Sequence, residues 1–110
     1  MGKFVISTRK NGEFQFNLKS DAGENLLVSE GYTARTNCLN GIESVKKNAQ
    51  IDGHFEKKTA SNGKFFFNLK SSNGQVVGTS EMLPDESSRE NKIQLVKKNA
   101  PQATLEETKA

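Results

Sequence analysis

Apolar and polar residues alternate along three short segments near the start of the chain. The segments KFVISTRK (3–10), EFQFNLKS (13–20) and NLLVSE (25–30) follow the pattern of strands that bury one face. From about residue 34 to residue 49, apolar residues instead recur three or four positions apart, which predicts a helix with one narrow apolar stripe. The first fifty residues therefore predict the order strand, strand, strand, helix.

The second half of the chain repeats the first. When Phe4–Ala49 is aligned with Phe55–Ala100 without a gap, 20 of the 46 pairs are identical. Because a unit of roughly 50 residues buries too little apolar surface to be stable alone, we expect the copies to share one core. The prediction is an α+β fold of two tandem βββα repeats related by a pseudo-twofold axis, with one antiparallel sheet and both helices on one face. We expect a single domain over 1–110, with repeats at about 3–50 and 54–100 and a tail or crossing strand at 101–110.

Loop lengths decide which residues share a face of this sheet. A three-residue loop at Lys10–Gly12, with Gly12 in the left-handed conformation, opposes Phe16 to Ile6. The same rule applied to 21–23 opposes Phe16 to Val28 and Leu18 to Leu26. The predicted buried face comprises Phe4, Ile6, Phe14, Phe16, Leu18, Leu26, Val28, Phe55, Phe65, Phe67, Leu69 and Val77. The predicted polar face comprises Asn17, Lys19, Asn25, Ser29, Asn68, Lys70 and Ser80.

The helices are expected to cover the apolar face. The predicted stripes are Ala34, Cys38, Ile42, Val45 and Ala49 in the first helix, and Ile93, Val96 and Ala100 in the second. Thr33 is a candidate N-cap, and Asn48 a candidate left-handed C-cap. Arg89 replaces Cys38 in the second copy, and we expect its guanidinium to reach solvent. Gly41, which Lys92 replaces, is interpreted as a point of close helix approach.

Composition narrows the class of protein only slightly. Of the 110 residues, 16 are Lys or Arg and 13 are Asp or Glu, and the net charge of +3 is too small to indicate nucleic-acid binding by itself. A single cysteine excludes an internal disulfide and a multi-thiolate metal site. No apolar run approaches the roughly 18 residues of a membrane span, and the N-terminus lacks a signal-peptide pattern. We expect a cytoplasmic protein without membrane association or cofactor.

The repeated motifs resemble those of a known family. The segments FNLKS and VKKNA, each present twice, and the stretch NGKFFFNLKSSNGQVVGTSE closely resemble the YegP-like proteins, small bacterial proteins of uncharacterised function. The resemblance covers about residues 3–100. It implies a β3α unit whose post-helix strand crosses to the other unit, here at about His54–Thr59 and Thr104–Glu107. It brings no catalytic residues, and whether 103–108 form a strand stays open.

Few side chains are candidates for chemistry. His54 is a candidate base or metal ligand, with a partly exposed linker residue as the favoured alternative. Cys38 is a candidate thiol, but its place on the apolar stripe favours a core role. The pairs Lys46–Lys47 and Lys97–Lys98 lie where cations stabilise a helix C-terminus. Because no acid/base pair, metal cluster or nucleophile emerges, we expect a protein that is not an enzyme.

The exposed face of the sheet is the candidate binding surface. The candidate residues on this face are Asn17, Lys19, Phe66, Asn68 and Lys70. The leading hypothesis is a small module that acts through protein–protein contacts, as a monomer because one chain holds both halves of the pseudo-dimer. The alternative is weak binding of single-stranded nucleic acid, since an exposed aromatic beside lysines can stack a base and neutralise phosphates. A single such aromatic and a small net charge weigh against that alternative.

Overall fold

Each half of the protein forms three strands followed by a helix in a computed structural model that describes residues 2–107. The first half contains β1 (Lys3–Thr8), β2 (Phe14–Lys19), β3 (Asn25–Val28) and α1 (Arg35–Asn48). The second contains β4 (Phe55–Thr59), β5 (Phe65–Lys70), β6 (Val76–Thr79) and α2 (Glu86–Asn99). Short 3₁₀ turns at Asp52–His54 and Ala100–Gln102 lead into β4 and into a last strand, β7 (Thr104–Glu107). The predicted order of elements is confirmed in both repeats.

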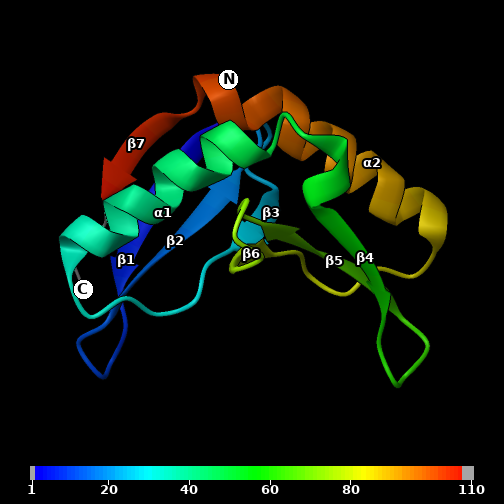
Figure 1. The fold of residues 1–110 in the computed structure, drawn as a ribbon, viewed down its shortest axis with the longest axis horizontal. Coiled ribbons are helices and arrows are strands. Elements are labelled where there is room, and N and C mark those ends of the chain that lie inside the picture. Colours follow the sequence, from blue (N-terminus) through cyan, green and yellow to red (C-terminus); the bar gives the residue numbers. More distant parts are fainter. Residues whose placement is uncertain (1, 108–110) are drawn as a thin grey trace.

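The strands of residues 2–107 form one seven-stranded sheet in the order β4-β5-β6-β3-β2-β1-β7, and both helices lie on the same side of it (Figure 1). The strand after each helix crosses to the other half, as the resemblance implied. The pairings are antiparallel as predicted, except that β7 is parallel to β1. The Thr104 N–H donates to the Gly2 carbonyl at 3.1 Å, so β7 starts beside the start of β1 and runs in the same direction. The last part of the predicted crossing segment, 108–110, lies outside the described residues.

The first hairpin of each repeat has the predicted register. Ile6 lies opposite Phe16, and Phe4 opposite Leu18. The Arg9 N–H donates to the Glu13 carbonyl at 2.7 Å, which closes the three-residue loop. Gly12 has a φ of 87°, a conformation that glycine adopts without steric cost.

The second hairpin departs from the prediction at a β-bulge. Leu18 lies opposite Leu27, and Asn17 opposite Val28, because the register shifts between Leu18 and Lys19. The predicted pairings of Leu18 with Leu26 and of Phe16 with Val28 are therefore wrong. The bulge adds one residue on β3 and thereby lets consecutive leucines 26 and 27 both be buried, while Val28 turns to the open face. The second repeat has the same shift at the equivalent position.

The core lies between the helices and the sheet. Its largest fully buried side chains include Phe4, Ile6, Phe16, Leu18, Leu26, Leu27, Val45, Phe67, Leu69 and Val96. Phe14 and Phe65 are only partly buried. Ser29 and Ser80, predicted on the polar face, are buried instead, because the register shift turns them to the core face. Their hydroxyls accept hydrogen bonds from the Phe16 and Phe67 N–H groups at 2.9 and 3.0 Å.

Several helix details differ from the predictions. The N-cap of α1 is the exposed Ala34, without a side-chain cap, rather than Thr33. Asn48 is not a left-handed cap: in the described chain, positive φ is confined to glycines, and the Asn48 Nδ2 donates to the Ser44 carbonyl at 2.8 Å. The guanidinium of Arg89 does not reach solvent. It donates to the Lys58 carbonyl at 2.9 Å and lies 5.2 Å from the centre of the Phe65 ring, which leaves Arg89 buried. Across 2–107, no helix has the length and apolar character that crossing a bilayer requires.

Candidate functional site

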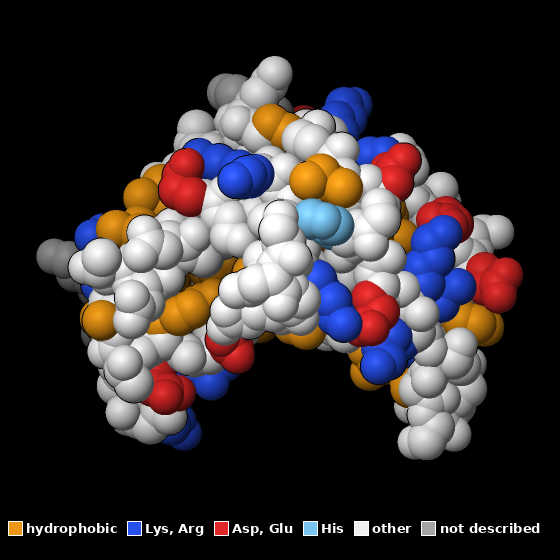
Figure 2. Space-filling view, in the orientation of Figure 1, with side chains coloured by type: hydrophobic (Ala, Val, Ile, Leu, Met, Phe, Trp, Pro, Cys, Tyr) orange, Lys and Arg blue, Asp and Glu red, His pale blue; other side chains and the backbone are white. Residues whose placement is uncertain are grey.

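The sheet face opposite the helices carries the candidate binding surface. Figure 2 shows the molecule hollowed on the side away from the helices, between the two β-hairpins. The open face is defined here by the outward side chains of Asn17, Lys19, Val28, Glu56, Phe66, Asn68, Lys70, Val76 and Thr79, together with those of Lys3, Val5 and Lys58. All five predicted site residues belong to it and are half-buried. They form two groups, on β2 and on β5, separated by β3 and β6.

The group on β5 is organised by a glutamate on the neighbouring strand. Glu56 Oε2 lies 2.9 Å from the Lys70 Nζ, and Glu56 Oε1 accepts the Asn68 Nδ2 at 3.1 Å. The hydrogen bond from Lys70 is the main reason, with that from Asn68 second, that the pKa of the Glu56 carboxyl is lowered. The side-chain Oδ1 of Asn68 in turn accepts a hydrogen bond from the Thr79 hydroxyl at 2.8 Å. The charge of Lys70 is thus neutralised within the protein. Glu56 belongs to this face, and it was not among the residues predicted from the sequence.

The signal for Glu56 was present in the strand register. Glu56 lies directly opposite Asn68 in the β4–β5 pair, so it shares a face with Asn68 and Lys70. A three-residue loop between β4 and β5 is enough to place it there. Opposite charges at neighbouring cross-strand positions attract each other, and this predicts the pairing.

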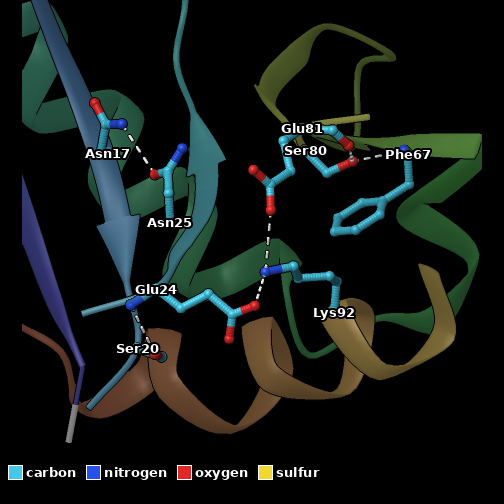
Figure 3. Close-up of polar contacts among 8 residues, drawn as sticks. All are labelled: Asn17, Ser20, Glu24, Asn25, Phe67, Ser80, Glu81 and Lys92. Atoms are coloured by element: carbon cyan, nitrogen blue, oxygen red, sulfur yellow. Dashed lines mark hydrogen bonds and ion pairs between the residues drawn. The ribbon is translucent and has the colours of Figure 1, made fainter. Parts of the chain in front are cut away.

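The group on β2 is polar and less charged. The Asn17 Nδ2 donates to the Asn25 Oδ1 at 2.9 Å, and the Gln15 Nε2 donates to the Asn17 Oδ1 at 3.4 Å (Figure 3 shows the first of these). Lys19 lies opposite Lys3, which is paired with Glu106 at 2.9 Å. Among the described residues Lys19 itself forms no ion pair.

The centre of the open face lies where the two repeats meet. Val28 pairs with Thr79, and these residues occupy equivalent positions in the two repeats, 51 apart. A hollow of about 370 Å³ lies at this junction, lined in part by Val28, Val76 and Thr79. Phe66 lies on the same face near the edge, opposite Lys58. The surface therefore combines aliphatic and aromatic groups with amides and with charges that are mostly paired.

A second polar cluster joins the repeats on the helix side of the sheet. Lys92 of α2 is buried and forms ion pairs with Glu24 and, at 3.3 Å, with Glu81 (Figure 3). Glu24 comes from the β2–β3 turn of the first repeat, whereas Lys92 and Glu81 belong to the second. The cluster ties the two halves together, and its three charges are satisfied internally. Sequence reasoning missed it because the partners are 68 residues apart.

The remaining candidates serve local structure. The His54 ring donates a hydrogen bond from Nδ1 to the Asn48 Oδ1, at 2.7 Å. Cys38 is buried, and burial is the main cause that raises the pKa of its thiol; the Arg35 guanidinium opposes that shift. Lys46 lies 3.6 Å from Glu43, and Lys97 pairs with Asp52. Within 2–107, no three His, Cys, Asp or Glu side chains are grouped in a way that would hold a metal ion.

The fold and the open face define a class: an α+β protein built from a duplicated βββα unit around one shared sheet. The chain belongs to the family described as "Domain of unknown function (DUF1508)", which matches residues 10–56 and 60–107, once for each repeat. The predicted resemblance to the YegP-like proteins is confirmed.

Relatives match over almost their whole length. The chain is 50% identical over 106 residues to the "UPF0339 protein in ptx operon 5'region" of Stutzerimonas stutzeri, covering 96% of each chain. It is 44% identical over 106 residues to the UPF0339 protein YegP of Escherichia coli K12, again covering 96% of each. The solution NMR structure of yegP from E. coli, a protein of unknown function, superposes with a TM-score of 0.94 at 43% identity, over 99% of this chain and 94% of that one. The solution NMR structure of a UPF0339 protein from Shewanella oneidensis gives a TM-score of 0.93 at 39% identity, over 98% and 92%.

Proposed function

We propose that the protein is a small, single-domain, non-enzymatic module of the cytoplasm that binds another protein on the open face of its sheet. The observation that carries the proposal is the composition of this face. Half-buried Val28, Val76 and Phe66 lie among amide side chains that retain hydrogen-bonding capacity. Such a mixture of apolar and uncharged polar groups is typical of transient protein interfaces.

The paired charges favour protein over nucleic acid as the partner. Lys70 and Lys3 are held by Glu56 and Glu106 at 2.9 Å each, so each brings a carboxylate with it. A phosphate chain approaching this face would meet those carboxylates as well as the lysines. Nucleic-acid binding depends on protein cations that neutralise phosphates and thereby release the counterions bound to the nucleic acid. Lysines that are already paired with a carboxylate contribute little to this release. Lys19 and Phe66 remain the features that the nucleic-acid alternative would use.

The chemistry of the face supports a binding role. Its side chains are amides, hydroxyls, aliphatic groups and ion pairs, which recognise a partner through contact and hydrogen bonding. Catalysis would need a nucleophile or a proton donor beside its acceptor. The thiol of Cys38 lies buried on the helix stripe instead, and His54 is engaged with Asn48.

We also propose that the protein acts as a monomer. The two repeats already provide each other with the partner that a single βββα unit lacks, through the β3–β6 junction and the crossing strands. Light scattering at micromolar concentration is expected to give a mass near 12.1 kDa. A mass near twice that value would contradict the proposal.

Capture from a bacterial lysate, with and without nuclease, tests the role of the open face. The immobilised protein is compared with a Lys19→Glu, Phe66→Ala double variant and with Lys98→Glu, which makes the same charge change on the exposed surface of α2. We expect a protein that is retained after nuclease treatment, lost with the double variant and kept with Lys98→Glu. If nuclease releases the captured material, nucleic acid is the partner. Equal capture by all three proteins would show that the open face is not the binding surface.

A nucleic-acid partner would also show a defined dependence on Phe66. Stacking contributes about 1–3 kcal/mol per base, so Phe66→Ala would then weaken oligonucleotide binding roughly 5- to 150-fold. Our proposal predicts that any affinity for a single-stranded oligonucleotide is weak and unchanged by this substitution. Fluorescence anisotropy with a labelled oligonucleotide measures both quantities.

A further inference from the structure

Strands β1 and β4 are equivalent in the two repeats, but only β1 is covered by a further strand. Residues of β1 and β4 correspond in the repeat with a spacing of 51, as Phe4 and Phe55 show. β1 is covered on its outer side by β7, whereas β4 is the last strand at its end of the sheet (Figure 1). The reason is topological: the segment after α1 becomes β4 itself, so residues 2–107 provide one additional strand for two equivalent positions.

We propose that the outer edge of β4 is a docking site for an extended segment of a partner protein. The segment would run parallel to β4 and carry an apolar residue followed by acidic residues. This site lies at the sheet edge and shares Glu56 and Lys58 with the open face, but it uses neither Lys19 nor Phe66, so either proposal can fail without the other.

β7 shows how such a segment is held at the equivalent edge. It pairs in parallel with β1, with Leu105 opposite Phe4 and Glu106 opposite Val5. Glu106 then pairs with Lys3 at 2.9 Å, and Glu107 with Arg35 of α1 at 2.6 Å. An apolar side chain beside the core phenylalanine and two carboxylates beyond it are therefore the pattern that this edge geometry accepts.

A groove lies on the helix side of β4, at the position that a strand equivalent to β7 would cover. Its volume is about 390 Å³, and Phe55 and Ile93 are among its lining residues. Phe55 is 8% exposed, whereas its equivalent Phe4, beside β7, is 0% exposed. In the docked segment, the residue equivalent to Leu105 would lie next to Phe55 and enter this groove. Hydrophobic contact with Phe55 and Ile93 would supply part of the affinity.

The charges along β4 favour acidic residues after the apolar one. By the register of β7, the residue equivalent to Glu106 would lie beside Glu56 and near Lys58, which shares the open face with Glu56. The Glu56 carboxylate lies 2.9 Å from the Lys70 Nζ but 3.9 Å from the Nζ of Lys58. Because Lys58 is exposed and the more distant of the two lysines, its ammonium group is available to a second carboxylate. The residue equivalent to Glu107 would lie beside Lys57, and there it would compete with Glu90 of α2.

Charge also distinguishes the β4 edge from the outer edge of β7. β7 presents Glu106, Glu107 and the half-exposed Leu105. An acidic segment would be repelled along β7, since like charges at facing strand positions are destabilising. Along β4 it would meet Lys57 and Lys58 together with Glu56, whose carboxylate is already held by Lys70. The same segment therefore has one preferred edge, and this makes the proposal specific enough to test by position.

The test uses the strand sequence that the molecule already accepts. A capped peptide of residues 100–107, APQATLEE, is titrated into the ¹⁵N-labelled full chain at physiological salt. We expect saturable shifts of the amides of β4 and of Ile93, with millimolar or sub-millimolar affinity. Replacing the peptide leucine by serine is expected to weaken binding about tenfold, because the contact with Phe55 is lost. A nitroxide on the peptide N-terminus is expected to broaden His54 more than Thr59, as a parallel orientation requires.

Protein variants provide the matched controls. Lys58→Glu is expected to weaken binding about 3- to 10-fold, whereas Lys64→Glu, the same charge change in the exposed β4–β5 turn, changes it less than about twofold. Phe66→Ala, on the open face, is expected to leave peptide binding unchanged. Absence of β4 shifts up to about 5 mM peptide, or shifts confined to β1 and β7, would overturn the proposal. So would equal losses from Lys58→Glu and Lys64→Glu, since these indicate attraction by net charge alone.

Discussion

Gly41 of α1 lies directly against the side chain of Tyr32. A β-carbon at position 41 would be 2.5 Å from the Tyr32 hydroxyl oxygen and 3.1 Å from the Phe16 ring. The Tyr32 ring is held in place, because it stacks on Phe16 with 6.3 Å between ring centres and an angle of 11° between planes. In the second repeat Lys92 and Leu83 occupy the two equivalent positions. Gly41 therefore allows the close helix approach that the sequence predicted, and the neighbours that α1 approaches are the side chains of Tyr32 and Phe16.

We predict that Gly41→Ala destabilises the protein even though alanine favours helix. Overpacking costs about 1–3 kcal/mol and exceeds the gain of about 1 kcal/mol in helix propensity, so we expect a net loss near 1 kcal/mol. In a Tyr32→Leu background, which copies the second repeat, the same substitution is expected to be stabilising. Urea unfolding of the four proteins measures the coupling. The same change in both backgrounds would show that Tyr32 is not what Gly41 accommodates.

Burial of Phe16 and exposure of its neighbour provide a second prediction. Phe16 is 0% exposed under the helices, whereas Gln15 faces outward and bonds Arg9 and Asn17 on the surface. Phe16→Ala is expected to cost about 3–5 kcal/mol, enough to unfold a marginal domain. Gln15→Ala is expected to change stability by less than about 0.5 kcal/mol. Similar small losses for both variants in chemical denaturation would contradict the assignment of faces.

Much of this fold could be predicted from periodicity and the repeat. Alternation at every second position identified the strands, and loop length fixed the first hairpin, so that Phe16 was correctly placed opposite Ile6. The β-bulge was missed because Asn25–Val28 fits alternation with either Leu26 or Leu27 inward. Only the finished core shows that both leucines are buried there. A local pattern does not contain that information.

The candidate site was predictable to a similar extent. Strand alternation placed Asn17 and Phe66 on the open face, as the structure shows. The partners that decide its charge, above all Glu56 for Lys70, follow from pairing between strands. Burial of Lys92 depends on Glu24 in the other repeat, and a helical stripe gives no sign of such a distant partner. The uncovered edge of β4 follows from the path of the whole chain and is visible only in the assembled sheet.

Cys38 is expected to react slowly with disulfide reagents in the native protein. The thiol is buried, and burial raises its pKa, so both access and the fraction of reactive thiolate are reduced. Thiol titration with an aromatic disulfide reagent is expected to give slow release in buffer and rapid release in denaturant. Rapid labelling of the native state would contradict the core position and reopen a redox role for Cys38.

The last prediction concerns acid. The pKa of the Glu56 carboxyl is lowered chiefly by its hydrogen bond with Lys70. Asp85 is the N-cap of α2, and its carboxylate accepts a hydrogen bond from the Ser88 backbone N–H at 2.7 Å. This hydrogen bond is the main reason that the pKa of Asp85 is lowered. A carboxyl with a lower pKa in the folded state than in the unfolded state stabilises the folded protein. This stabilisation is complete at pH values above the unfolded-state pKa, which is about 4 for these groups. That stabilisation is lost as the pH falls through the lower, folded value. The urea midpoint is therefore expected to stay level near neutral pH and to fall below about pH 4.

Replacing one of these carboxyls identifies its share of the acid response. Glu56→Gln keeps the shape of the side chain but removes the titrating group, so we expect a lower midpoint at pH 7 and a flatter fall toward pH 3. Glu43→Gln, on the exposed surface of α1, removes one carboxylate away from the sheet and serves as the control. Because the Glu56 contribution depends on Lys70, a Lys70→Met variant is expected to flatten the profile in the same way. A fall as steep as that of the wild type in both Glu56→Gln and Lys70→Met would show that this pair does not couple folding to pH.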